Sequence, residues 1–153
     1  MTRYVEKVLQ PGETVVFETK VHWFVYLPAL FFSLFIVAGV AILIIEPAEK
    51  IFVYGPIGLG LLLGVPSFLK AFFTRWTTEI AVTDRRVIYK RGFIRRITIE
   101  MNMDKVESID VNQSILGRVF DYGDVLVRGT GHGLEPLKMI QAPLTFRSAV
   151  IAR

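Results

Sequence analysis

Two uncharged segments decide the fold of this chain: residues 23–45, WFVYLPALFFSLFIVAGVAILII, and residues 51–69, IFVYGPIGLGLLLGVPSFL. A helix needs about 20 apolar residues to cross the hydrocarbon core of a bilayer. The sequence therefore predicts a transmembrane helical hairpin whose turn lies at residues 46–50. The alternative is a pair of buried helices in a soluble protein. We disfavour it because the 22 residues before the hairpin and the 84 after it are too few to enclose two helices that are apolar on all sides.

Positive charge is concentrated directly after the second segment. Residues 70–96 carry eight basic side chains against Glu79 and Asp84, whereas residues 97–153 carry six basic and seven acidic side chains. Lys and Arg near the ends of membrane helices are retained on the cytoplasmic side. The turn of the hairpin carries two Glu and one Lys. We therefore expect a multi-pass membrane protein with both termini in the cytoplasm.

Period-two alternation marks most of the remaining chain and is typical of half-buried strands. It predicts a strand within residues 13–21, six further strands and a C-terminal helix that begins at Pro143, where the fixed φ of proline suits a first turn. The six strands are expected at residues 79–83, 86–91, 96–101, 106–111, 124–130 and 137–142. Consecutive short strands with polar turns predict a strongly bent antiparallel sheet or barrel closed by that helix.

The first predicted strand precedes the hairpin, and a lone strand is not stable in water. We expect it to join the sheet formed after the hairpin. The hairpin, residues 23–69, would then be an insertion into one cytoplasmic domain built from residues 1–22 and 70–153.

The second apolar segment contains a GxxxG motif at Gly60 and Gly64. Such small residues let another helix approach closely. The partner could be the first helix, through Ala29, Ser33 or Ala38, or another protomer; alternatively, these glycines reflect only the frequency of glycine in membrane helices. Neither segment holds an ionisable residue at depth, which disfavours a self-contained transporter or channel.

The composition excludes several kinds of site. With no cysteine and only two histidines, His22 and His132, the chain has no disulfide or thiolate metal site, and a histidine-rich metal centre is disfavoured. A site made of carboxylates alone stays possible at Asp104, Glu107 and Asp110, but we interpret these as an exposed strand edge.

The stretch GTGHG at residues 129–133 lacks the Lys and Ser/Thr of a phosphate-binding loop, so we predict a hairpin turn there. No serine lies in the context of a nucleophile elbow. We expect no enzyme and no cofactor.

Four motifs connect the chain with a known family. They are LQPGE at residues 9–13, IAVTDRRV at 80–87, GFI at 92–94 and VNQSILGR at 111–118, which continues into DYGDV at 121–125. With them the chain resembles, over nearly its whole length, the bacterial pleckstrin homology-like (PH-like) family of small membrane proteins of the YdbS type. The resemblance implies a bent antiparallel barrel or sandwich with a C-terminal helix, at the inner (cytoplasmic) membrane. It implies no ligand specificity and no catalytic residues.

The resemblance also suggests a structural role for residues 113–123, with Gly117 and Gly123 at positive φ. The apolar side chains of this connection could equally form a partner surface: Ile115, Leu116, Val119 and Phe120.

The basic cluster is the candidate functional site. Anionic lipids attract cations beside a membrane by about 1 kcal/mol for each Lys or Arg, so we expect six side chains to contact lipid headgroups: Arg85, Arg86, Lys90, Arg91, Arg95 and Arg96. Alternatively, these residues only enforce topology and protect strand edges.

Three functions follow from these observations. The first is a membrane-anchored binding or scaffold protein whose PH-like domain engages anionic lipid, a membrane-protein partner or copies of itself. The second is an accessory subunit of a larger membrane transport or enzyme complex, docked through the GxxxG face. Nucleic-acid binding is the weakest, because the bilayer already explains the charge and few aromatic side chains are placed for base stacking.

Overall fold

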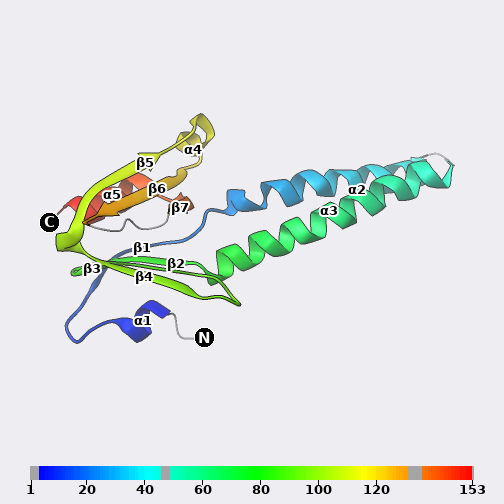
Figure 1. The fold of residues 1–153 in the computed structure, drawn as a ribbon. Helices are drawn as coiled ribbons and strands as arrows, with labels where there is room; N and C mark the ends of the chain where they lie inside the picture. Colours follow the sequence, from blue (N-terminus) through cyan, green and yellow to red (C-terminus); the bar gives the residue numbers. More distant parts are fainter. Residues whose placement is uncertain (1–3, 46–48, 131–135, 153) are drawn as a thin grey trace. The chain divides into compact units, whose positions relative to one another are not determined.

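The structure, a computed structural model, describes residues 4–45, 49–130 and 136–152. It divides into two compact units, Met1–His22 with Thr74–Arg153, and Trp23–Phe73. We call the first the β domain and the second the helical unit (Figure 1). The β domain is thus built from two separate parts of the chain.

The β domain contains two antiparallel sheets, in the strand orders β1-β2-β3-β4 and β5-β6-β7. The first sheet consists of β1 (Val15–Thr19), β2 (Glu79–Thr83), β3 (Arg86–Arg91) and β4 (Ile97–Asn102). The second consists of β5 (Val106–Asn112), β6 (Tyr122–Gly129) and β7 (Leu137–Gln141). The helix α5 (Pro143–Ile151) follows, with Pro143 in its first turn as predicted. These elements confirm the predicted mostly-β fold with a C-terminal helix.

One apolar core joins both sheets and α5. Alternate residues of the first sheet point into it, because successive side chains of a strand lie on opposite faces. The members contributed by the first sheet include Ile80, Val82, Val87 and Tyr89; the second sheet contributes Val125, Val127, Leu137 and Ile140, and α5 contributes Phe146 and Val150. Phe146 is fully buried, so α5 is part of the core and not a surface appendage.

The chain after β1 connects the two sheets. The backbone carbonyl of Lys20 accepts a hydrogen bond from the backbone amide of Gln141, and Val21 forms an antiparallel β-bridge with Ile140. The backbone amide of His22 donates to the Met139 carbonyl at 2.7 Å. The last strand of the second sheet is thereby held against the continuation of β1, which gives the domain its bent, barrel-like closure.

A short helix that the sequence analysis did not predict covers the outer face of the first sheet. This helix, α1 (Tyr4–Val8), buries Val5 against Ala81 and Ile88. The sheet is therefore apolar on both faces at β2 and β3, which explains why Ala81 and Ile88 are fully buried although they point away from the main core.

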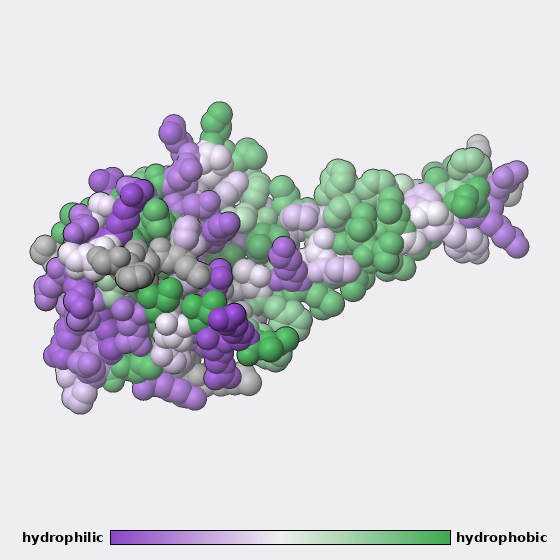
Figure 2. Space-filling view, in the orientation of Figure 1, coloured by the Kyte–Doolittle hydropathy of each residue, from purple (hydrophilic) through white to green (hydrophobic). Residues whose placement is uncertain are grey.

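The helical unit contains a short 3₁₀ helix, η1 (Trp23–Tyr26), and α2 (Leu27–Ile45), followed by the first part of α3 (Lys50–Thr77). Two helical segments are long and apolar enough to cross a membrane, Trp23–Ile45 and Lys50–Thr77. In the most apolar 18 residues of each, only 6% and 11%, respectively, are buried inside the protein. Figure 2 shows hydrophobic residues along most of this unit. The predicted hairpin turn at residues 46–50 lies largely outside the described residues.

The helix α3 continues eight residues beyond the predicted end at residue 69. Lys70 ends the apolar segment and Arg75 follows it, but both residue types are good helix formers, so the helix continues through them. Its 28 residues span about 42 Å at about 1.5 Å per residue, which exceeds the roughly 30 Å of a hydrocarbon core.

Candidate functional site

The strand registers give the β domain two distinct ends. Thr19 pairs with Ile80 and Glu79 pairs with Lys90, so the end of β1, the start of β2 and the end of β3 lie together. We call this the attachment end, because the chain leaves here toward α2 and returns here from α3. At the opposite, distal end, Val15 pairs with Thr83 and Arg86 pairs with Asn102.

The six predicted lipid-contacting side chains divide between these two ends. Arg85 lies in the turn between β2 and β3, and Arg86 is the first residue of β3, so both are at the distal end. Lys90 and Arg91 lie at the attachment end, as do Arg95 and Arg96, because Arg91 pairs with Ile97 across the β3–β4 turn. One five-residue strand, about 17 Å long, separates the two groups.

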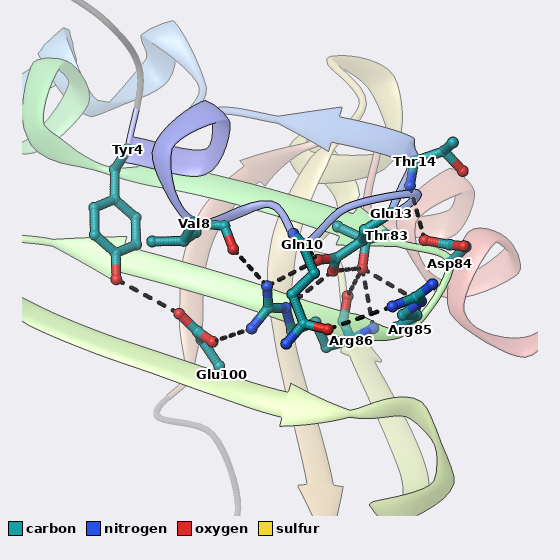
Figure 3. Close-up of polar contacts among 10 residues, drawn as sticks. All are labelled: Tyr4, Val8, Gln10, Glu13, Thr14, Thr83, Asp84, Arg85, Arg86 and Glu100. Atoms are coloured by element: carbon teal, nitrogen blue, oxygen red, sulfur yellow. Dashed lines mark hydrogen bonds and ion pairs between the residues drawn. The ribbon is translucent and has the colours of Figure 1, made fainter.

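At the distal end, Arg86 is part of a network that joins residues from before and after the helical unit (Figure 3). Its Nε donates to Glu13 Oε1 at 2.9 Å, and its Nη2 donates to Glu13 Oε2 at 2.8 Å. The Thr83 hydroxyl also donates to Glu13 Oε1 at 2.7 Å. Arg86 Nη1 forms a further ion pair with Glu100 at 2.6 Å. The Glu13 side chain is completely buried and that of Arg86 is 12% exposed.

This pairing sets the charge state of both groups. The hydrogen bond from Arg86 lowers the pKa of Glu13 to about 2, against the opposing effect of burial. The same hydrogen bond is the main reason why the pKa of Arg86 is raised. Glu13 is therefore ionised at neutral pH although it is buried, and Arg86 is engaged within the protein.

Further contacts of the network explain two of the motifs found in the sequence. The Thr14 amide donates to the Asp84 carboxylate at 2.8 Å, and Arg85 Nη1 donates to Gln10 Oε1 at 3.3 Å. Arg86 Nη2 also donates to the Val8 carbonyl at 2.6 Å. The motif LQPGE and the motif TDRR therefore contact each other, and together they fasten the N-terminal segment to the β2–β3 turn.

Lys90 is also engaged within the β domain. Its Nζ donates to Glu79 Oε1 at 2.7 Å and lies 5.3 Å from the centre of the Tyr4 ring. Burial alone would raise the pKa of Glu79, but the hydrogen bonds from Lys90 and the Val5 amide outweigh it, so the pKa is lowered. Lys90 and Glu79 thus hold α1 on the sheet.

The turn between β3 and β4 is an exposed feature of the attachment end. Gly92 has φ of 96°, and a Cβ there would collide with the Arg95 carbonyl oxygen. Glycine is required because this φ is costly for other residues. Beyond it, Phe93 is 57% exposed and Ile94 is 97% exposed. Arg91, Arg95 and Arg96 are exposed around these two apolar side chains. The Phe93 ring lies 5.9 Å from that of Trp76, in the last turn of α3.

A second apolar feature lies at the same end. The predicted connection after β5 contains a short helix, α4 (Ile115–Val119), which the Ser114 hydroxyl caps by accepting from the Gly117 amide at 3.0 Å. Directly after it, the Tyr122 ring stacks on the buried His22 ring with 5.1 Å between centroids. His22 is the last residue of the β domain before α2, so α4 is placed at the attachment end.

The prediction of positive φ at Gly117 and Gly123 is wrong, because neither is among the residues with positive φ. Both glycines instead allow close approach. A Cβ on Gly117 would lie 2.6 Å from the Tyr122 carbonyl oxygen, and one on Gly123 would lie 2.7 Å from the Gln113 side chain.

The family comparison agrees with this architecture. The model of the family described as "Bacterial PH domain" matches residues 24–149. The chain belongs to this family. No curated protein and no solved structure matches the chain. The match does not distinguish the YdbS type, which stays an expectation.

The matched region of this bacterial PH domain begins after β1 and the Glu13 network. Residues 4–22 are nevertheless integral to the fold, since β1 pairs with β2 and Val21 pairs with Ile140. PH-like domains are generally non-catalytic. Among the described residues, no group of three or more His, Asp or Glu side chains is placed to hold a metal ion.

The remaining predicted sites are either exposed on the surface or lie partly outside the described residues. Asp110 pairs with Arg128 at 2.9 Å on the surface, both more than half exposed, and Asp104 and Glu107 are exposed as well. Of the stretch 129–133, Gly129 lies at the end of β6, while His132 and its neighbours at 131–133 lie outside the described residues.

Within the helical unit, Gly60 and Gly64 face α2. A Cβ on Gly60 would lie 2.5 Å from the Ile36 side chain, and one on Gly64 would lie 3.4 Å from the Phe32 Cβ. Gly39 of α2, which the sequence analysis did not single out, approaches Ile57 and Val53 equally closely. Beside this contact lies an apolar groove of about 520 Å³. The small residues Ala29 and Ser33 line it together with Gly60 and Gly64.

Proposed function

We propose that this bacterial PH domain is a membrane-anchored binding module, whose attachment end contacts anionic lipid headgroups through Arg91, Arg95 and Arg96. The helices α2 and α3 serve as its anchor in the cytoplasmic membrane. The excess of basic residues after α3 favours the cytoplasm for both termini and for the β domain.

One observation carries the proposal: the strand registers place these three exposed arginines at the end where both anchoring helices join the β domain. A residue beside such a junction stays close to the membrane surface, where anionic headgroups attract each cation by about 1 kcal/mol.

The proposed site is smaller than the cluster expected from sequence. Arg86 is engaged with two carboxylates and Lys90 with one. Arg85 contacts Gln10 at the distal end, one strand length away from the junctions. These three residues support the fold in our proposal and do not contact headgroups.

Lipid retention by the full-length protein tests the proposal. The protein is purified in mild detergent with phosphatidylglycerol and phosphatidylcholine in equal amounts, and native mass spectrometry counts the bound molecules of each. We expect selective retention of phosphatidylglycerol. The double variant Arg95→Gln/Arg96→Gln should lose about 2 kcal/mol of this preference, roughly 30-fold in affinity.

The variant Arg85→Gln/Lys105→Gln is the matched control, because it removes the same charge from exposed positions at the distal end. Equal loss in both variants would point to bulk electrostatics and against a defined site. A stoichiometric membrane protein that co-purifies in place of lipid would favour the alternative function of an accessory subunit.

A further inference from the structure

We infer that the attachment end is a two-pronged surface that inserts apolar side chains into the interfacial layer of the bilayer. One prong is the β3–β4 turn with Phe93 and Ile94, and the other is α4 with Ile115 and Val119. The inference rests on the proposed function in placing this end against the membrane. It adds apolar insertion, which the headgroup contact does not require.

The exposure of these side chains is unusual for a surface in water. Ile94 is 97% exposed, Ile115 is 81% exposed and Val119 is 70% exposed. Transfer of one such side chain from water to a fully apolar environment is favourable by about 1.5–3 kcal/mol. Clustered exposure of this kind marks surfaces that contact a partner or a membrane.

These side chains are concentrated at one end of the β domain. Its described residues include eleven exposed large hydrophobic side chains, and seven of them belong to the two prongs and the adjoining last turn of α3. The seven are Trp76, Phe93, Ile94, Ile115, Leu116, Val119 and Phe120. Figure 2 shows hydrophobic residues projecting where Figure 1 places α4. At the distal end the exposed side chains include charged ones such as Arg85, Asp104 and Lys105.

Contacts inside the β domain place each prong beside one chain junction. Trp76, whose ring lies near Phe93, is in the final turn of α3. Tyr122, which follows α4, stacks on His22 directly before the helical unit begins. Each prong is thus tied by an aromatic pair to a residue at one chain junction, Trp76 in the last turn of α3 and His22 directly before the helical unit.

The charges around the prongs favour a bilayer over a protein partner. Arg95 and Arg96 directly follow Ile94, and Arg118 lies within α4. Apolar tips rimmed by Lys and Arg are typical of segments that lie in the membrane interface, where the cations reach the headgroups.

Depth measurements with a fluorescent label test the inference. The chain contains no cysteine, so Ile94→Cys, Val119→Cys and the distal control Lys105→Cys each give one labelling position. All three positions are exposed, so little packing is lost. The full-length protein is labelled with a nitrobenzoxadiazole dye and placed at one copy per nanodisc. Discs contain phosphatidylcholine alone or with phosphatidylglycerol, and the readouts are emission wavelength and the rate of quenching by aqueous dithionite.

In the discs that contain phosphatidylglycerol, we expect the emission at positions 94 and 119 to be blue-shifted relative to position 105. Quenching by dithionite should be many-fold slower at positions 94 and 119 than at position 105. Insertion in both lipids without selective retention of phosphatidylglycerol would support the inference and contradict the proposed headgroup site. Fast quenching at both prongs in both lipids would overturn the inference, even if phosphatidylglycerol retention is normal. Shielding that is absent at one copy per disc but present in parallel discs loaded with two copies would also overturn it, because the occupant would then be a second protomer.

Discussion

Arg86 and Glu13 are joined by two parallel hydrogen bonds of 2.8 and 2.9 Å, although 73 residues and the entire helical unit separate them in the chain. The carboxylate is fully buried. This pair fastens the segment before the helical unit to the first turn after β2, and it converts two separated parts of the chain into one domain.

Loss of the Glu13 charge should destabilise the β domain. Glu13→Gln leaves the mostly buried Arg86 with only Glu100 as an ionic partner. Removing one member of a buried pair costs about 3–5 kcal/mol, and we expect the low end because Glu100 remains. For a domain of roughly 100 residues this lowers the melting temperature by more than about 10 °C.

The matched control for this variant is Asp110→Asn, which breaks an ion pair whose two side chains are more than half exposed. Such surface pairs contribute about 0–1 kcal/mol. Thermal unfolding in detergent, followed by circular dichroism at wavelengths that report strands, distinguishes the two. Similar melting temperatures for both variants would mean that the Glu13–Arg86 pair does not hold the domain together.

The same pair predicts how stability depends on pH. The pKa of Glu13 is about 2 in the folded protein and about 4.5 in an unfolded chain. Because the folded value is the lower one, this stabilisation is complete above about pH 4.5 and is lost as the pH falls toward about 2. Melting temperatures measured across this range should fall less steeply for Glu13→Gln than for the wild type. Equal slopes would show that Glu13 does not titrate in this way.

The close approach of α2 and α3 predicts a disulfide within one chain. An ideal Cβ at Gly64 lies 3.4 Å from the Phe32 Cβ, close to the 3.5–4.5 Å found across disulfides. The double variant Phe32→Cys/Gly64→Cys should therefore cross-link on oxidation without a change from monomer mass. Cross-linked dimers instead would assign the GxxxG face to contact between protomers. Phe32→Cys/Gly58→Cys is the control, because a Cβ on Gly58 has no neighbour within 4 Å.

The two glycines of α3 also predict different costs of substitution. Gly60→Leu places a side chain where a Cβ already lies 2.5 Å from Ile36 and 3.0 Å from the Phe32 carbonyl. Gly58→Leu meets open space. We expect Gly60→Leu to lower the melting temperature of the helical unit and Gly58→Leu to leave it unchanged or raised, since leucine favours helix more than glycine. Equal effects would place Gly60 outside the helix contact.

The strands could be predicted from the sequence because the alternation of apolar and polar residues is a local signal. The strands β2 and β3 begin and end at the predicted residues. The sequence did not predict α1 or α4. Each has five residues, too short for a periodic pattern, and α1 is held in place by burial of Val5 on Ala81 and Ile88. Such contacts come from tertiary structure and leave no local signal.

The division of the basic cluster could have been found from sequence. In an antiparallel meander, successive turns lie at opposite ends of the sheet. The predicted strands 79–83, 86–91 and 96–101 therefore already separate Arg85 and Arg86 from Arg95 and Arg96. The pairing of Arg86 with Glu13 could not be found in this way, because no spacing rule connects residues on either side of a 51-residue unit.

Membrane topology tests most directly the proposal that α2 and α3 cross the membrane and that the β domain they interrupt lies in the cytoplasm. Glu49→Cys places a thiol beside the turn between α2 and α3, and Ser108→Cys places one on the exposed surface of β5. Both are treated in intact cells with a maleimide that does not cross membranes. We predict that position 49 is labelled in intact cells and that position 108 is labelled only after the membrane is permeabilised. Labelling of position 108 but not position 49 in intact cells, or recovery of the protein in the soluble fraction, would contradict it.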